Sequence, residues 1–195
     1  MATMPTTGAA VLGTIDTPIG RFGAAFSPAG LGQLAAPRQP FAACEAWVRR
    51  WLPDAPVLDE SPWLEQLSIE LNAYFAGALR TFSIPLDLRG TPFQQDVWRT
   101  LQTIPYGEVW SYTQLAHAIG RPKAVRAVGA ANALNPVAIL VPCHRLIGSD
   151  GALRGYAGGL ELKQQLLQLE GALDRAAPPS ADARQRYRVQ YASQV

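Results

Sequence analysis

The sequence predicts a two-domain α/β protein. An N-terminal α/β domain with a small antiparallel sheet is expected over residues 1–90, and a mainly helical domain with a helix-turn-helix over residues 91–173. Strand-like and helix-like apolar patterns alternate in the first part, whereas helix start signals recur at short intervals in the second. A chain of 195 residues with 48% hydrophobic and 16% charged residues is long enough, and apolar enough, for two small globular cores.

The first domain opens with a hairpin. Residues 14–27 predict two strands joined by a turn at Pro18-Ile19-Gly20. Apolar side chains at helical spacing then predict helices over residues 41–52 and 63–76, and residues 82–88 are expected to return to a strand. We interpret the aromatic residues of these elements as core.

The second domain begins with a capped helix. Thr91 suits the N-cap and Pro92 the first helical position. Ser111 can cap a short helix that ends at Ile119, and another helix is expected over residues 122–133. Two short helices joined by a glycine-containing turn have the form of a helix-turn-helix, although many such pairs bind nothing.

The end of the chain changes composition twice. Five glycines between residues 148 and 159 predict a loop, which a last helix over residues 160–170 follows. From residue 174 the composition turns to Ala, Pro, Ser, Arg and Gln, so residues 174–195 are expected to form a poorly ordered tail.

Charge is distributed unevenly. Residues 109–149 contain Arg121, Lys123, Arg126 and Arg145 but no acidic residue, although the whole chain has a net charge of only +2. A carboxylate-free window favours a polyanionic partner. On charge alone, a basic surface without a partner is an equal alternative.

Several classes of protein are disfavoured. No apolar run approaches the roughly 18 residues of a membrane span, and the N-terminus lacks the features of a signal peptide. Cys44 and Cys143 are too few for a disulfide framework, which indicates a reducing, cytoplasmic setting. With His117 and His144 they are also too scattered for a zinc site, so we expect no metal.

The most informative segment is Pro142-Cys143-His144-Arg145. It follows an aliphatic run, residues 137–141, which predicts a buried strand that ends at a thiol, an imidazole and a guanidinium. A cysteine is a useful nucleophile only as the thiolate, which neighbouring basic groups stabilise. The alternative for an isolated Cys-His pair is a core cysteine beside a surface histidine.

The flanking segments decide between these alternatives. Residues 91–171 resemble the catalytic domain of the O6-alkylguanine-DNA alkyltransferases, also called methylated-DNA–protein-cysteine methyltransferases, in the order and spacing of their motifs. The N-terminal ninety residues resemble the variable α/β domain of that family more loosely, chiefly at Thr17-Pro18-Ile19-Gly20. The matching segments are Gly90-Thr91-Pro92-Phe93-Gln94, Ile104-Pro105-Tyr106-Gly107, Ser111-Tyr112-Thr113-Gln114-Leu115-Ala116, Arg126-Ala127-Val128-Gly129, Asn135-Pro136, Val141-Pro142-Cys143-His144-Arg145, Gly158-Gly159-Leu160 and Glu170-Gly171.

The resemblance implies DNA repair by direct, irreversible transfer of an alkyl group from guanine O6 to the protein's own cysteine, and leaves open whether thymine O4 is also a substrate position. Cys143 would be the nucleophile, His144 would take its proton through a bridging water, and Glu170 would orient the imidazole. Tyr112 would donate a hydrogen bond to O6, and Asn135 would fix the cysteine loop. No cofactor is implied, and an S-alkyl cysteine has no route to release its alkyl group.

The resemblance also implies how double-stranded DNA is held. Arg126 would fill the stack after the damaged nucleotide is flipped out, and the helix-turn-helix, of winged-helix-like form, would dock in the minor groove without sequence specificity. The remaining residues of the predicted contact surface fall into three groups. They are the small residues Ala127, Gly129 and Ala130, the basic residues Lys123 and Arg145, and, at the base pocket, Tyr156 and the carbonyl groups of Val141 and Cys143.

Two other functions are compatible with parts of this pattern. One is a lesion sensor that binds alkylated guanine without transfer, and the other is a cysteine hydrolase built on Cys143, His144 and Glu170. Ala157 departs from the family, because some members carry a serine there that hydrogen-bonds near O6. We expect the protein to act as a monomer and leave cooperative assembly on DNA open.

Overall fold

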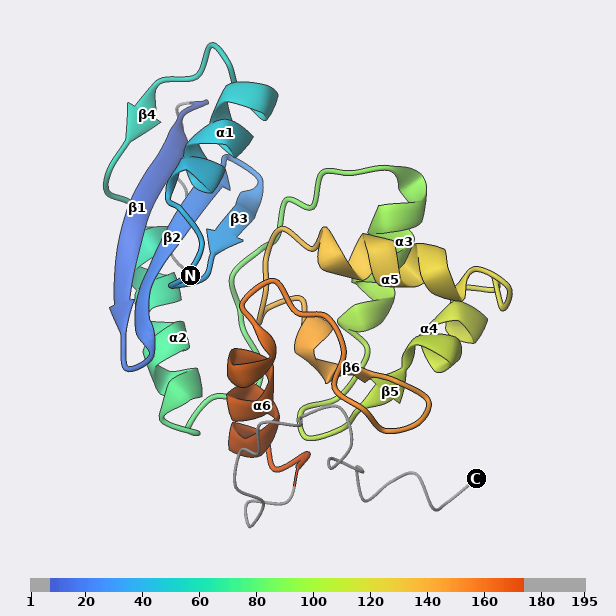
Figure 1. Cartoon of the computed structure of the whole chain (residues 1–195). Helices are drawn as coiled ribbons and strands as arrows, with labels where there is room; N and C mark the ends of the chain where they lie inside the picture. The colour runs from blue at the N-terminus through green and yellow to red at the C-terminus, as the bar shows by residue number, and fades with distance from the viewer. Residues whose placement is uncertain (1–7, 174–195) are drawn as a thin grey trace. The chain divides into compact units, whose positions relative to one another are not determined.

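The computed structural model describes residues 8–173, which divide into two units (Figure 1). One unit contains residues 8–89 together with residues 136–138, and the other contains residues 90–135 and 139–173. The chain therefore returns to the first unit for three residues just before the Cys-His segment. The predicted tail, residues 174–195, lies outside the described residues.

A four-stranded sheet forms the centre of the first unit. Its strands are β1 (Ala10–Thr17), β2 (Gly20–Ser27), β3 (Gly30–Ala35) and β4 (Val57–Leu58), in the order β3-β2-β1-β4. Pairing is antiparallel between β1 and β2 and between β2 and β3, whereas β4 is parallel to β1. The predicted hairpin is confirmed, whereas the neighbouring strand β3 was not predicted.

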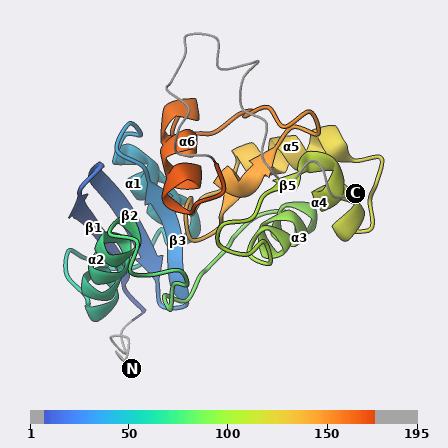
Figure 2. The same cartoon turned by 90° about the horizontal axis from the view of Figure 1, so that it is seen from below.

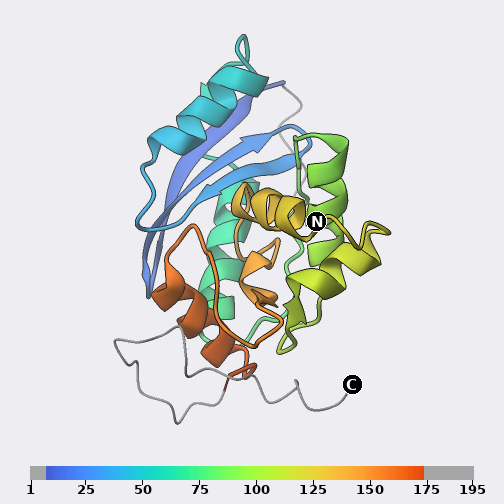
Figure 3. The same ribbon diagram turned by 45° about the vertical axis from the view of Figure 1, so that its right-hand side comes forward.

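Two helices cover opposite faces of this sheet (Figure 3). They are α1 (Ala42–Trp51) and α2 (Pro62–Phe75), close to their predicted ranges. A Cβ atom at Gly23 would meet Cys44 of α1, and one at Gly13 would meet Leu64 of α2. Because Gly13 is paired with Ala24, the neighbour of Gly23, and successive residues of a strand point to opposite faces, the helices lie on opposite sides.

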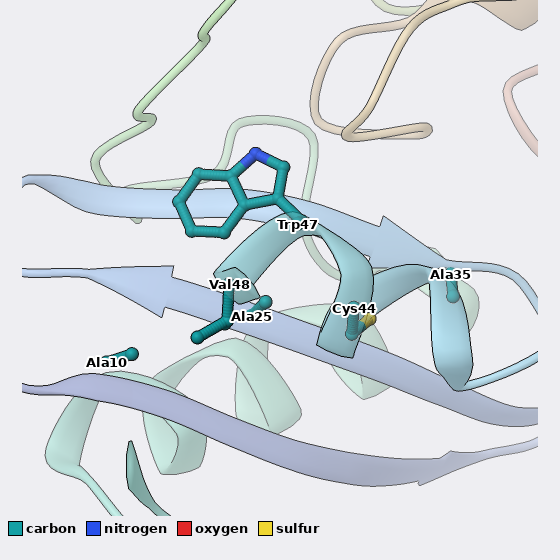
Figure 4. Packing of buried hydrophobic residues seen from close by; sticks show 6 residues of the cluster. All are labelled: Ala10, Ala25, Ala35, Cys44, Trp47 and Val48. Atoms are coloured by element: carbon teal, nitrogen blue, oxygen red, sulfur yellow. The ribbon is translucent and has the colours of Figure 1, made fainter. Parts of the chain in front are cut away.

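Small strand residues allow α1 to approach the sheet closely. Ala10, Ala25 and Ala35 form the floor against which Cys44, Trp47 and Val48 pack (Figure 4). A Cβ atom at Gly32 would lie 1.9 Å from the Trp47 ring, so no larger residue fits at Gly32 while this packing persists.

The predicted strand over residues 82–88 is wrong. Only Leu86 forms an isolated bridge, to Leu31, while the N–H of Leu31 donates to Pro85 O and the N–H of Asp87 donates to Leu31 O. Proline has no N–H to continue a ladder, so Pro85 limits the pairing with β3 to this short contact.

The second unit is mainly helical, and α3, α4 and α5 pack against one another (Figure 2). Thr91 and Ser111 form capping boxes with Gln94 and Gln114, which confirms the predicted starts of two helices. The helix after Pro122 begins later than predicted, because a turn precedes it. The elements are α3 (Pro92–Leu101), β5 (Trp110–Ser111), α4 (Tyr112–Ala118), α5 (Val125–Ala133), the 3-10 turn η1 (Cys143–Arg145), β6 (Leu146–Ile147) and α6 (Leu160–Leu169).

The predicted strand over residues 137–141 is also wrong. The segment is buried, as expected, but it forms single bridges and a turn, and Cys143 begins a 3-10 turn instead of ending a strand. Ile139 has φ of 78°, a left-handed conformation that is costly for a β-branched residue. Val137 forms an isolated bridge with Leu34 of β3. The chain then passes to the second unit at Ile139, so the segment does not continue along β3 as a strand.

Candidate active site

Cys143 lies buried at the start of η1, with its backbone N–H donating to Val141 O at 2.8 Å. Burial raises the pKa of its thiol, because the charged thiolate loses solvation. The side-chain amide of Asn135, the charge of Lys163 and the N–H groups of Cys143 and His144 act in the opposite direction. The thiol is thus shielded from water but surrounded by groups that favour its anion.

Asn135 closes the loop that precedes the thiol. Its Nδ2 donates to Val141 O at 2.8 Å. A carbonyl oxygen has two lone pairs, and the N–H of Cys143 uses the second one. The Val141 carbonyl is therefore occupied within the loop, so the expectation that it reads the edge of a base does not fit the structure.

His144 and Glu170 form a fully buried pair, with Nε2 of the histidine 2.9 Å from Oε1 of the carboxylate. Burial raises the pKa of Glu170, but hydrogen bonds and charge from His144 and Arg145 outweigh this effect and lower it to about 2. The ionised carboxylate can only accept hydrogen bonds, so Nε2 of His144 carries the hydrogen and donates it. Nδ1 then keeps its lone pair, and this buried atom has no hydrogen-bond partner in residues 8–173.

Burial also sets the charge of the imidazole. Desolvation lowers the pKa of His144, although the Glu170 carboxylate raises it in part. The ring is therefore neutral at pH 7 and able to accept a proton at Nδ1.

Arg145 points into the core and not toward a DNA surface. Its Nε and Nη2 donate to the two oxygens of Glu170 at 2.8 and 2.9 Å, and its Nη1 donates to Ile104 O at 2.6 Å. A bidentate guanidinium fixes both the position and the charge of a carboxylate. The predicted DNA contact of Arg145 is inconsistent with this burial, and we assign it to holding Glu170.

The motif around Gly107 supports the same carboxylate. The N–H of Gly107 donates to Glu170 Oε2 at 3.3 Å, and the hydroxyl of Tyr106 donates to Leu169 O at 3.2 Å. Gly107 has φ of 83°, and a Cβ atom there would lie 3.0 Å from Glu170 O. Glycine is required here both by conformation and by space.

Two tyrosines contribute to the surroundings of the thiol. Tyr112, the first residue of α4, donates its hydroxyl to Arg154 O at 3.4 Å. Burial raises the pKa of Tyr112 and of Tyr156, and the charge of Cys143 adds to both shifts. Both hydroxyl groups are therefore protonated at pH 7. The Tyr156 ring lies edge-on to His144, with centroids 6.5 Å apart, and its buried hydroxyl has no partner in the described residues.

Helix α5 exposes small and basic side chains. Arg126, Ala127 and Ala130 are exposed on it, and Lys123 is exposed in the preceding turn. Gly129 is half-buried, and a Cβ atom there would come within 3.9 Å of the Tyr112 ring. This face of α5 permits close approach by another backbone, with cationic groups at its start.

Lys163, a residue of α6 that was not among the predicted site residues, is completely buried. Its Nζ donates to Leu146 O and, at 2.7 Å, to Arg154 O. The signal was present in the spacing, because Lys163, Leu166, Leu167 and Glu170 occur at i, i+3, i+4 and i+7, on one helical face. Two charged residues on an apolar helical face indicate buried polar contacts.

Within residues 8–173, no helix is long and apolar enough to cross a membrane. In the same range, no three His, Cys, Asp or Glu side chains are grouped so that they could hold a metal ion.

These features define a class: a helix-turn-helix protein with a buried thiol beside a neutral histidine and an ionised glutamate. Family models agree with this class. Residues 92–172 match the DNA binding domain of 6-O-methylguanine DNA methyltransferase, and residues 11–88 match the ribonuclease-like domain of the same protein. The chain belongs to the 6-O-methylguanine DNA methyltransferase family.

Individual relatives are similar over most of the chain. The methylated-DNA–protein-cysteine methyltransferase of Mycobacterium bovis is 49% identical over 157 residues, which are 80% of this chain and 90% of that one. The constitutive enzyme of that name from Bacillus subtilis is 55% identical over 112 residues, 57% of this chain and 68% of that one. A crystal structure of Mycobacterium tuberculosis OGT in complex with DNA has a TM-score of 0.71 at 45% identity, covering 83% of this chain and 92% of that one.

Proposed function

We propose that this chain repairs DNA by accepting, on Cys143, the alkyl group of an O6-alkylated guanine. The observation that carries this proposal is the buried series Cys143, His144 and Glu170 in a member of the methyltransferase family. The substrate is alkylated guanine in double-stranded DNA. The reaction uses the chain's own residues and one water molecule.

The first step makes the thiolate. The thiol proton moves to a water molecule and from it to Nδ1 of His144, the buried nitrogen whose lone pair faces no protein donor in the described residues. Glu170 holds Nε2–H and stabilises the imidazolium that forms. Arg145 and Gly107 keep that carboxylate ionised and in place.

The second step is transfer. The sulfur attacks the alkyl carbon, a C–S bond forms, the C–O6 bond breaks, and the electron pair stays on the guanine. The hydroxyl of Tyr112 turns from Arg154 O and donates its hydrogen bond to O6, since its pKa is raised and it keeps its proton. The proton that left the thiol ends on guanine. The thioether product has no good leaving group, so each chain acts once.

The third element is access to the base. The exposed small face of α5 docks in the minor groove, and Arg126 enters the stack that the flipped nucleotide leaves. Lys123 contacts phosphate, so affinity falls with salt and does not depend on sequence. The chain binds as a monomer. A reducing compartment such as the cytoplasm suits a protein whose single-use thiol must stay reduced.

Intact mass after incubation with an O6-methylguanine duplex tests this proposal. Cys143 should gain one methyl group, and Cys143→Ala should gain none. Cys44→Ser is the matched control, because Cys44 is a core cysteine whose pKa burial raises to about 11, and it should gain the methyl group like the wild type. Tight binding without a mass change would favour the lesion sensor, and turnover of an ester would favour the hydrolase.

A further inference from the structure

Lys163 is the charged residue of the site that the proposed chemistry leaves without a role. Its side chain is 0% exposed, and its ammonium group bridges two carbonyl groups. One belongs to Leu146, the residue directly after η1, whose own N–H donates to Cys143 O. The other belongs to Arg154, in the glycine-rich loop of residues 148–159.

Burying a charged lysine lowers the stability of the fold unless neighbouring groups stabilise the charge. Desolvation lowers the pKa of Lys163 to about 8, and the negative charge of Cys143 acts in the opposite direction. Lys163 in turn lowers the pKa of Cys143. The contact with Leu146, whose N–H donates to Cys143 O, brings the Lys163 ammonium group to the end of the turn that carries the thiol, and among residues 8–173 no ion pair joins Lys163 to a carboxylate.

We propose that Lys163 is a positioning residue that fixes the glycine-rich loop to the chain beside Cys143 and provides the positive charge that favours the thiolate. This inference rests on the proposed function, in which that thiolate attacks the alkyl group. The contact at Arg154 also links Lys163 to Tyr112, the proposed hydrogen-bond donor to guanine O6, because Arg154 O accepts from the Tyr112 hydroxyl as well.

The other titratable groups around the thiol do not provide this charge. Tyr112 on α4 and Tyr156 in the loop keep their protons at pH 7, because burial raises the pKa of each. His144 is neutral, because burial lowers its pKa. The charge of Arg145 is matched by the Glu170 carboxylate that it binds in bidentate fashion. Among the described residues, Lys163 is therefore the cation whose charge acts on Cys143.

The test measures how fast Cys143 reacts with iodoacetamide from pH 6 to 10, resolved by peptide mass so that Cys44 is separate. Lys163→Met fills the same space without a charge, and Lys163→Gln keeps a hydrogen-bond donor without a charge. An opposite charge at close range typically shifts a pKa by about one or more. Both variants should therefore move the midpoint upward and slow the reaction about tenfold at pH 7, where Lys163 is still charged.

The controls separate charge from structure. Gln165→Met introduces methionine at an exposed position of the same helix and should leave the midpoint unchanged. Lys163→Arg keeps the charge and should keep the midpoint even if the melting temperature falls. Amide exchange in residues 148–159 should accelerate in Lys163→Met.

The result that overturns the inference is an unmoved midpoint in both neutral variants, or an unmoved midpoint in Lys163→Gln when Lys163→Met does not fold. A fall in melting temperature without a midpoint shift would likewise leave only a structural role and refute the charge. Iodoacetamide labelling needs no DNA, so this outcome is independent of methyl transfer. If the wild-type chain took up no methyl group from DNA, the proposed function would fail while the labelling result stood.

Discussion

Replacing Glu170 with glutamine removes a buried charge to which four N–H groups are directed. They are Nε2–H of His144, two N–H groups of Arg145 and the backbone N–H of Gly107. The amide that replaces the carboxylate has one oxygen to accept with and an NH₂ group that must face one of these donors. The substitution therefore leaves the buried Arg145 guanidinium without its counter-charge.

The size of this effect follows from the pKa of the carboxyl group. The pKa of Glu170 falls from an ordinary 4.5 to about 2 in the folded protein. A difference of about 2.5 at about 1.36 kcal/mol per pH unit corresponds to ~3.4 kcal/mol. Breaking a buried ion pair by removing one partner costs about 3 to 5 kcal/mol. Glu170→Gln should thus lower the free energy of unfolding at pH 7 by about 3 kcal/mol or more.

The sign of the pH dependence is fixed by the same shift. A carboxyl group whose pKa is lower in the folded state stabilises the fold above its unfolded pKa, here about 4.5. That contribution is lost as the pH falls toward the folded pKa of about 2. The difference in the free energy of unfolding between wild type and Glu170→Gln should therefore be more than ~1 kcal/mol smaller at pH 3.5 than at pH 7.

Urea unfolding of both chains at pH 7 and pH 3.5 measures these differences. Glu161→Gln, an exposed substitution of the same kind at the start of α6, is the matched control and should change stability by less than about 1 kcal/mol. If Glu170→Gln lowered the free energy of unfolding by less than about 1 kcal/mol at pH 7, or by the same amount at both pH values, the buried carboxylate would not stabilise the fold in this way.

Three further substitutions have defined outcomes. Arg126→Ala should slow methyl transfer from duplex DNA far more than reaction with free O6-benzylguanine in single-turnover assays. An equal loss of rate on both substrates would contradict the proposed role of Arg126 in filling the base stack. Asn135→Ala deletes the bond to Val141 O and should cost about 1 to 3 kcal/mol in urea unfolding. It should also slow iodoacetamide labelling of Cys143, because the amide lowers the thiol pKa, and an unchanged rate would contradict that role. Ser111→Ala should cost about 1 kcal/mol through loss of the α4 cap, and Ser111→Asn should restore most of it.

Local signals predicted local structure well. Thr91 and Ser111 mark the starts of α3 and α4 because an N-cap acts within three residues of itself. The hairpin of β1 and β2 was predicted for the same reason, since its turn lies between adjacent strands. The motifs that placed Cys143 in a known family are likewise short and ordered along the chain.

Contacts between distant residues account for the errors. The aliphatic run before Pro142 has strand propensity, but its pairing with Leu34 and the left-handed backbone of Ile139 break the ladder. The inward turn of Arg145 depends on Glu170, which is 25 residues away. The spacing of Lys163 on the apolar face of its helix indicated burial, but its partners could not be predicted, because they are the backbone carbonyl groups of Leu146 and Arg154.

The central claim is that Cys143 takes one alkyl group per chain and restores guanine. The most direct measurement counts restored guanines per protein chain when an O6-methylguanine duplex is present in excess. We expect a plateau at one guanine restored and one methylated Cys143 per chain. Continued repair beyond one lesion per chain, or repaired DNA with Cys143 unmodified, would contradict it.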